Sequence, residues 1–130
     1  MSGRKSQQSD YRAERGVMEL PFPPSTNSIW RAYRGRNISS KAYRQWQVEA
    51  GAELIAQRPD KHEGPVHVTM TFGLPDKRRR DIDNLAKPVN DLLVTHQVIQ
   101  RDDAAFLKKL TLQIGEGFKG VRVQVEGING

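Results

Sequence analysis

Alternating apolar and polar residues predict four strands, because successive side chains of a strand face opposite sides of a sheet. The alternating segments are residues 17–22, 66–72, 106–114 and 121–126. Apolar residues three and four apart predict two helices, one over residues 41–58 and one after Asp81. The predicted order is strand, loop, helix, strand, helix, strand, strand. It predicts an α+β (mixed α/β) domain, with a small mixed β-sheet of about four strands and two helices on one face.

Local signals add three expectations about connections. The last two strands are expected to form a hairpin, because residues 115–120 make a glycine-containing turn between them. Residues 98–100 are apolar enough either to pair as a strand or to pack. Pro88 has no amide hydrogen and crowds the carbonyl of Asn84, so the second helix either starts near Leu85 or is kinked in its first turns. Backbone groups left free at this point would suit a binding site.

Length and charge limit the classes of protein. The chain has 130 residues, which suits one domain, and its formal charge of +6 favours an anionic partner such as nucleic acid. It has no cysteine, which excludes disulfides and thiolate zinc sites, and no apolar run near the ~20 residues of a membrane span. We see no secretory signal and expect a cytoplasmic protein. Residues 1–16 are predicted to be a flexible basic tail, which either touches nucleic acid or is merely solvated, and residues 17–130 a single domain.

The most unusual stretch is residues 77–91, KRRRDIDNLAKPVND, which concentrates charge of both signs. Its four leading cations are Lys77, Arg78, Arg79 and Arg80. Two carboxylates, Asp81 and Asp83, follow directly, and the pair Asp102–Asp103 comes later. Phosphodiester chemistry uses such a combination, because cations attract the polyanion and carboxylate oxygens hold a divalent metal. The stretch therefore predicts a metal-dependent nuclease site.

Each candidate residue also has a structural interpretation. Asp81, Asp83 and Asp103 are the candidate ligands of Mg²⁺, but an aspartate can instead cap a helix or form a turn. Lys87 either stabilises charge on a phosphate or forms a salt bridge four residues along its helix, with Asp83 or Asp91. The four cations either contact the DNA backbone or line a solvated loop.

Residues 30–36, WRAYRGR, interleave aromatic and basic side chains. Arginines and aromatics in such a mixture can bind phosphates and stack on bases, and the arginines here are Arg31, Arg34 and Arg36. The alternative is a surface loop whose Trp30 and Tyr33 pack on the core.

The segments RRRDIDNLAKPVNDLL and the later DD pair resemble the RusA family of Holliday junction resolvases. LPFPPSTNSIWR, SSKAYRQW and the last two strands are also similar to that family, so the resemblance runs from about Met18 to the end. Members often have a glycine and an aromatic residue before the DD pair, where this chain has THQVIQRDD.

The resemblance implies a bacterial or phage-encoded homodimer that nicks four-way DNA junctions symmetrically, with Mg²⁺, for which Mn²⁺ substitutes. It implies catalytic roles for Asp81, Asp83, Lys87 and Asp103. Three further residues are expected to contact the catalytic side chains without binding the metal: Asp102, Asp91 and Asn84. A dimer also follows from the reaction, because two cuts related by two-fold symmetry need two sites.

Two other functions stay open from the sequence. One is a nucleic-acid-binding module without catalysis, in which the acids are structural. The other is a metal-dependent nuclease that acts on another branched DNA or on RNA.

Overall fold

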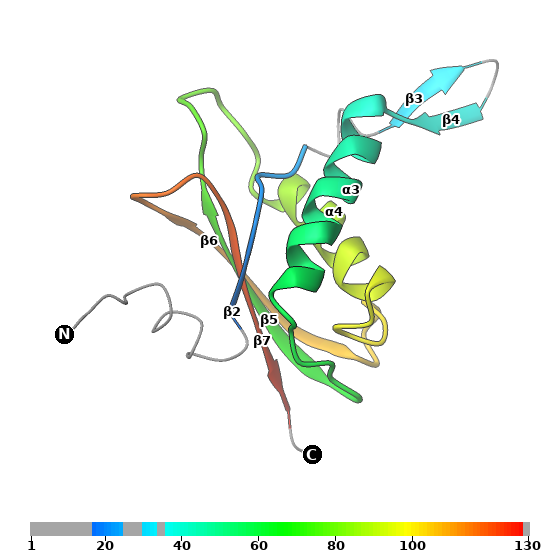
Figure 1. The fold of residues 1–130 in the computed structure, drawn as a ribbon, viewed down its shortest axis with the longest axis vertical. Coiled ribbons are helices and arrows are strands. Elements are labelled where there is room, and N and C mark those ends of the chain that lie inside the picture. Colours follow the sequence, from blue (N-terminus) through cyan, green and yellow to red (C-terminus); the bar gives the residue numbers. More distant parts are fainter. Residues whose placement is uncertain (1–16, 25–29, 34–35, 129–130) are drawn as a thin grey trace.

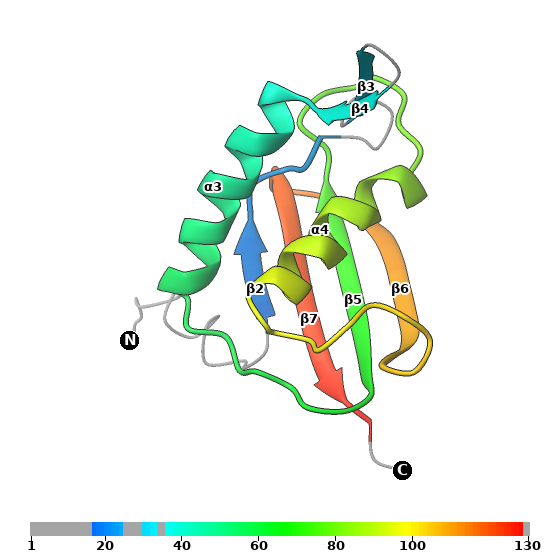
Figure 2. The same ribbon diagram turned by 90° about the vertical axis from the view of Figure 1, so that its right-hand side faces the viewer.

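The computed structural model describes residues 17–24, 30–33 and 36–128, and residues 30–33 and 36–39 by their backbone only. A four-stranded mixed sheet has the order β2-β7-β5-β6. Its strands are β2 (Val17–Leu20), β5 (Val66–Gly73), β6 (Leu107–Gly115) and β7 (Gly120–Gly127). Two helices, α3 (Lys41–Ala56) and α4 (Asp83–Thr95), lie on the same side of this sheet (Figures 1 and 2). The predicted α+β architecture is therefore confirmed.

The predicted hairpin of the last two strands is wrong. β5 lies between β6 and β7, pairing parallel with β6 and antiparallel with β7. The connection between β6 and β7 therefore crosses the end of β5. It passes so close that a Cβ atom on Gly73 would overlap the carbonyl oxygen of Phe118. Gly117 and Gly120 supply the positive φ angles, 91° and 127°, that turn the chain there.

A second, two-stranded sheet replaces the loop predicted for residues 30–36. β3 (Trp30–Tyr33) and β4 (Arg36–Ser39) pair antiparallel, and they lie apart from the main sheet beyond the start of α3 (Figure 1). Arg31 and Arg36 belong to these strands by their backbone. The side chains of both arginines, and all of Arg34, lie outside the described residues.

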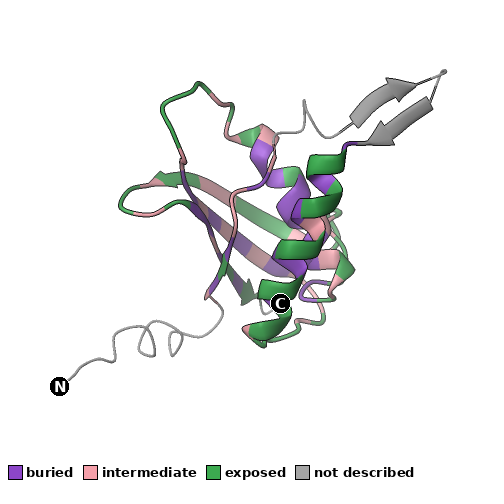
Figure 3. Cartoon of the chain, turned by 45° about the horizontal axis from the view of Figure 1, so that its top comes forward, coloured by how far each residue is buried: buried purple, intermediate pink, exposed green. Residues whose placement is uncertain are grey.

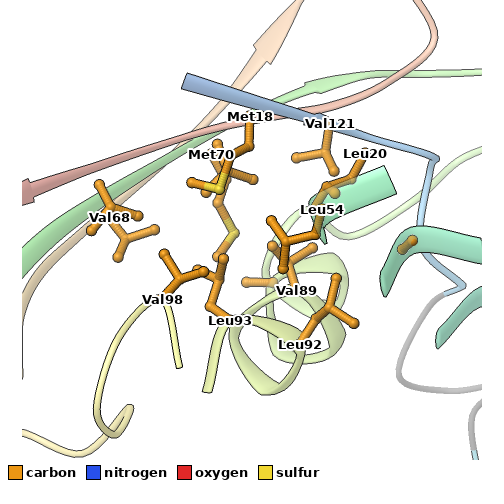
Figure 4. Close-up of a cluster of buried hydrophobic side chains, with 14 of the residues drawn as sticks. Met18, Leu20, Leu54, Val68, Met70, Val89, Leu92, Leu93, Val98 and Val121 are labelled. Carbon is orange, nitrogen blue, oxygen red and sulfur yellow. The ribbon is translucent and has the colours of Figure 1, made fainter. Parts of the chain in front are cut away.

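The core lies between the sheet and the two helices. Apolar side chains of β2, β5 and β7 point toward those of α3 and α4 (Figure 4), and the inner faces of the elements are buried (Figure 3). Trp46 of α3 is 5% exposed and belongs to this core, whereas Ile55 near the end of the helix is 62% exposed. Ser40 caps α3 by accepting a hydrogen bond from the amide of Tyr43 at 3.1 Å. Among the described residues no helix is long and apolar enough to cross a membrane.

The start of α4 and the turn after it contain residue types that are unfavourable in the conformations they adopt. The helix begins at Asp83, earlier than the predicted alternative near Leu85, and it contains Pro88. At its far end Gln97 has a φ of 63°, a left-handed conformation in which glycine is the preferred residue. The chain then turns sharply, so that Val98 and Ile99 are both fully buried. Val98 and Ile99 therefore pack in the core, and residues 98–100 do not pair as a strand.

Candidate active site

The charged residues gather around a β5–α4–β6 unit. Because β5 and β6 are parallel, the chain must return along the sheet between them, and α4 makes this return. Asp81 and Asp83 therefore follow the carboxyl end of β5, where α4 begins. The Asp102–Asp103 pair instead precedes the start of β6, at the other end of the connection that contains α4. The fold thus gives two acidic pairs, with α4 running between them.

A salt bridge organises the basic segment, residues 77–80. The guanidinium Nη1 and Nη2 of Arg80 donate to the two carboxylate oxygens of Asp76 at 2.7 and 3.2 Å. The amide of Arg78 also donates to Asp76, at 2.9 Å. Arg80 further lies over the ring of Phe22, 5.2 Å from its centroid, and its side chain is only 14% exposed. The hydrogen bonds from Arg80, and then from the Arg78 amide, hold the pKa of Asp76 well below its usual value.

The four cations consequently differ in what they can offer DNA. Arg80 is committed to Asp76 and fixes the shape of the segment. The Arg78 side chain is 80% exposed, although its Nε lies 3.4 Å from Asp76. Lys77 and Arg79 are exposed, and neither side chain has a hydrogen bond or ion pair to any other described residue. Phosphate contacts therefore fit Lys77, Arg78 and Arg79 better than Arg80.

Asp81 and Asp83 are exposed at the start of α4 and do not cap it. The N-cap residue is Ile82, and no side chain makes a capping hydrogen bond. Asp81 Oδ2 accepts a weak hydrogen bond from Asn84 Nδ2 at 3.5 Å. The carboxylate of Asp83 has no hydrogen bond or ion pair to another described residue. Asp83 therefore has no structural partner among the described residues, and Asp81 has only the weak one from Asn84.

Lys87 stands between the two acidic pairs. Its Nζ lies 3.0 Å from Asp91 Oδ1 and 3.4 Å from Asp102 Oδ2, so it joins α4 to the segment before β6. The hydrogen bond that Lys87 donates to Asp91 is the largest cause that raises the pKa of Lys87, so the ammonium stays charged. The predicted alternative, a salt bridge four residues along the helix, is present with Asp91. The added contact with Asp102 makes this more than a helix-surface pair.

Asp103 makes contacts of its own. Its Oδ1 accepts the amide of Ala105 at 3.0 Å, and its Oδ2 lies 3.0 Å from Nε of Arg101. In the structure Asp103 therefore stabilises a turn, which was the structural alternative to metal binding. Within the described part of the chain, no three histidine, cysteine or acidic side chains are grouped closely enough to hold a metal ion. The structure thus brings Asp102, and not Asp103, to Lys87.

Two residues near the site were missed from the sequence. Asp76 was given no role at the site, although an aspartate two and four residues before arginines signals the contacts it makes. Tyr43 of α3 is buried beside the site. Burial raises the pKa of its hydroxyl, and the charge of Asp91 raises it further. Nothing in the sequence indicated that α3 reaches Asp91.

Comparison with known proteins gives one consistent result. The model of the family "Endodeoxyribonuclease RusA" matches residues 21–126. A "Crossover junction endodeoxyribonuclease RusA" of Aquifex aeolicus is 31% identical over 110 residues, which cover 84% of this chain and 86% of that protein. The proteins of that name from Escherichia coli K12 and Enterobacteria phage 82 are 38% and 35% identical, each over 57% of this chain and 62% of the relative. The matched residues contain the basic segment, both acidic pairs and Lys87. This chain therefore belongs to the RusA family of endodeoxyribonucleases.

Proposed function

We propose that this protein is a Mg²⁺-dependent, structure-selective endodeoxyribonuclease, which resolves four-way DNA junctions by paired symmetric nicks during recombination and repair in the bacterial cytoplasm. The observation that carries the proposal is the placement of Lys87. Its ammonium joins Asp91 and Asp102, two acids of the matched region. The same region holds the exposed cations Lys77, Arg78 and Arg79. Binding of DNA alone would need the cations but would not need carboxylates beside them, which repel phosphate.

The donor chemistry fits a hard divalent cation. Asp81 and Asp83 present exposed carboxylate oxygens, and Asp83 has no partner among the described residues. We assign Asp103 as the third carboxylate ligand of the metal. The three do not form a group as they stand, so the segment before β6 has to move toward the start of α4 when DNA and metal bind. The chemistry that Mg²⁺ supplies in such a site is neutralisation of phosphate charge and activation of water.

The chain's own residues have distinct roles in this proposal. Lys77, Arg78 and Arg79 bind phosphates of the junction arms, helped by Arg31, Arg34 and Arg36. Lys87 donates to an oxygen of the phosphate being cleaved, where negative charge grows in the transition state. Asp91 and Asp102 aim the ammonium, and Asn84 holds Asp81.

A homodimer is part of the proposal, because one small domain carries one site and a junction needs two opposed cuts. The outer edge of β6 pairs with no other described strand, and this strand exposes Leu110 and Ile114, by 38% and 51%. Light scattering at micromolar concentration tests the dimer. We expect about twice the chain mass of 14.7 kDa, and a mass near 14.7 kDa would contradict it.

Asp81→Asn tests the proposed catalysis. Amide replacement keeps the size of the side chain and removes its charge, so junction binding should survive while metal-dependent nicking is lost. Asp60→Asn is the matched control, because Asp60 is exposed and has no ion pair among the described residues. Nicking by Asp81→Asn at the wild-type rate would reject the assigned role. Failure of the wild type to nick any junction with Mg²⁺ or Mn²⁺ would reject the nuclease function itself.

A further inference from the structure

A cavity of about 970 Å³ opens before the start of α4, with Asp76 and Asp81 in its lining. Its walls come from three parts of the chain: residues 22–24, residues 42–49 of α3, and residues 75–84, which run into the start of α4. Its volume lies near the upper end of the ~300–1,000 Å³ of typical ligand pockets, which is ample for one nucleotide.

The apolar wall is held rigidly from behind. Phe22 packs edge-to-face on the core residue Phe72, with ring centroids 6.4 Å apart. The indole Nε1 of Trp46 donates to the carbonyl of Pro21 at 2.9 Å, which ties this segment to α3. Arg80 adds its contact with the ring of Phe22. An apolar wall that is ordered before the ligand arrives can pack against a base without a further cost of ordering.

The polar walls differ in charge. Residues 75–81 contribute Arg78 and Arg79, both exposed, and these attract a phosphate. The α3 wall contributes Gln45 and Glu49, which are also exposed and are joined by a hydrogen bond of 3.1 Å from Gln45 Nε2 to Glu49 Oε2. The carboxylate of Glu49 repels phosphate and can only accept hydrogen bonds, so it suits an amino group on a base edge.

We propose that this cavity holds one unstacked nucleotide of the cleaved strand, with its phosphate on Arg78 and Arg79 and the amino group of its base on Glu49. The proposal rests on the proposed function, because Asp81 lines the same cavity and would face the neighbouring phosphodiester. Unstacking costs least where pairing is already disturbed, and the branch point of a junction is such a place. The cavity would therefore make the enzyme select both a branched DNA structure and the base beside the cut.

The experiment removes the amino group from the DNA and its acceptor from the protein. Nicks made by the wild type are first mapped on junctions of several sequences. The bases flanking each nick are then replaced singly by analogues without the exocyclic amine: purine for adenine, 2-pyrimidinone for cytosine and hypoxanthine for guanine. Single-turnover nicking rates are compared for wild type, Glu49→Ala, Glu49→Gln and Glu53→Gln. Glu53 is an exposed acid of the same helix that does not line the cavity, so Glu53→Gln is the matched control.

We expect one flanking position at which loss of the amine slows the wild type and Glu53→Gln by about tenfold or more. Glu49→Ala should nick both DNAs at one rate, and Glu49→Gln, which keeps an acceptor oxygen, should retain part of the discrimination. If the wild type nicks junctions but ignores every analogue, or if Glu49→Ala discriminates as well as the wild type, the nucleotide site is wrong and the nuclease function stands. If the wild type nicks no junction, both proposals fail.

Discussion

Replacing Lys87 by methionine separates a catalytic ammonium from a merely structural salt bridge. Methionine keeps most of the apolar stem of the side chain and removes the charge. In the structure the ammonium has two carboxylate partners, at 3.0 and 3.4 Å, and the side chain is 59% exposed. An exposed pair contributes about 0.2–1 kcal/mol to stability, so the loss of both should cost at most about 2 kcal/mol. At ~2.1 cal/mol/K of unfolding entropy per residue, that loss lowers the Tm by at most about 7 °C.

The expected loss of activity is much larger. Removal of one group that stabilises charge in a transition state typically slows catalysis by about 10²–10³-fold. We therefore expect single-turnover nicking of a four-way junction to fall at least about a hundredfold in Lys87→Met, with junction binding nearly unchanged. Lys61→Met is the control, because Lys61 is exposed and has no ion pair within the described residues. Nicking within about twofold of wild type would show that Lys87 is only a structural partner of Asp91 and Asp102.

Three further predictions follow from single contacts. Asp76→Asn frees Arg80 and should speed tryptic cleavage in residues 77–80, where Asp60→Asn should not; equal digestion of both would refute the role of Asp76. Gln97→Gly relieves the φ of 63° and should raise the free energy of unfolding by about 0.5–1 kcal/mol in urea denaturation, and a loss would contradict this. Because the pKa of Lys87 is raised, its contribution to stability is complete below pH 10.5 and is lost at higher pH. The free energy of unfolding of the wild type should therefore exceed that of Lys87→Met by a constant amount from about pH 6 to 9, and this difference should shrink above pH 10.5. A difference that shrinks below pH 9 would argue against the raised pKa.

Patterning predicted the faces of the strands well and their partners poorly. In β5, alternate side chains are fully buried against the helices, as the alternation of residues 66–72 indicated. Alternation does not say which strand lies beside which, and the short turn favoured a hairpin. In the structure β5 lies between β6 and β7, and Gly73 leaves room for the β6–β7 connection to pass over its end. β6, with Lys108 and Lys109 exposed, has the charged character of an edge strand.

The site shows the same division between local and distant information. Spacing along α4 predicted that Lys87 and Asp91 share a face, and their salt bridge follows from it. Spacing along the sequence could not predict contacts between residues that are far apart in the chain. The turn at Gln97 sets how the chain leaves α4, and this places Asp102 rather than Asp103 at Lys87. The cavity beside Asp81 likewise needs three segments that are distant in sequence.

Mapping the products of one junction is the decisive test of the proposed junction-resolving activity. A four-way junction is labelled on each strand in turn and incubated with wild-type protein, with Mg²⁺ or with a chelator. We predict nicks on two opposed strands, placed symmetrically about the branch point, only when the metal is present. Absence of nicks with both Mg²⁺ and Mn²⁺, or equal cutting of linear duplex DNA, would contradict a junction-resolving nuclease.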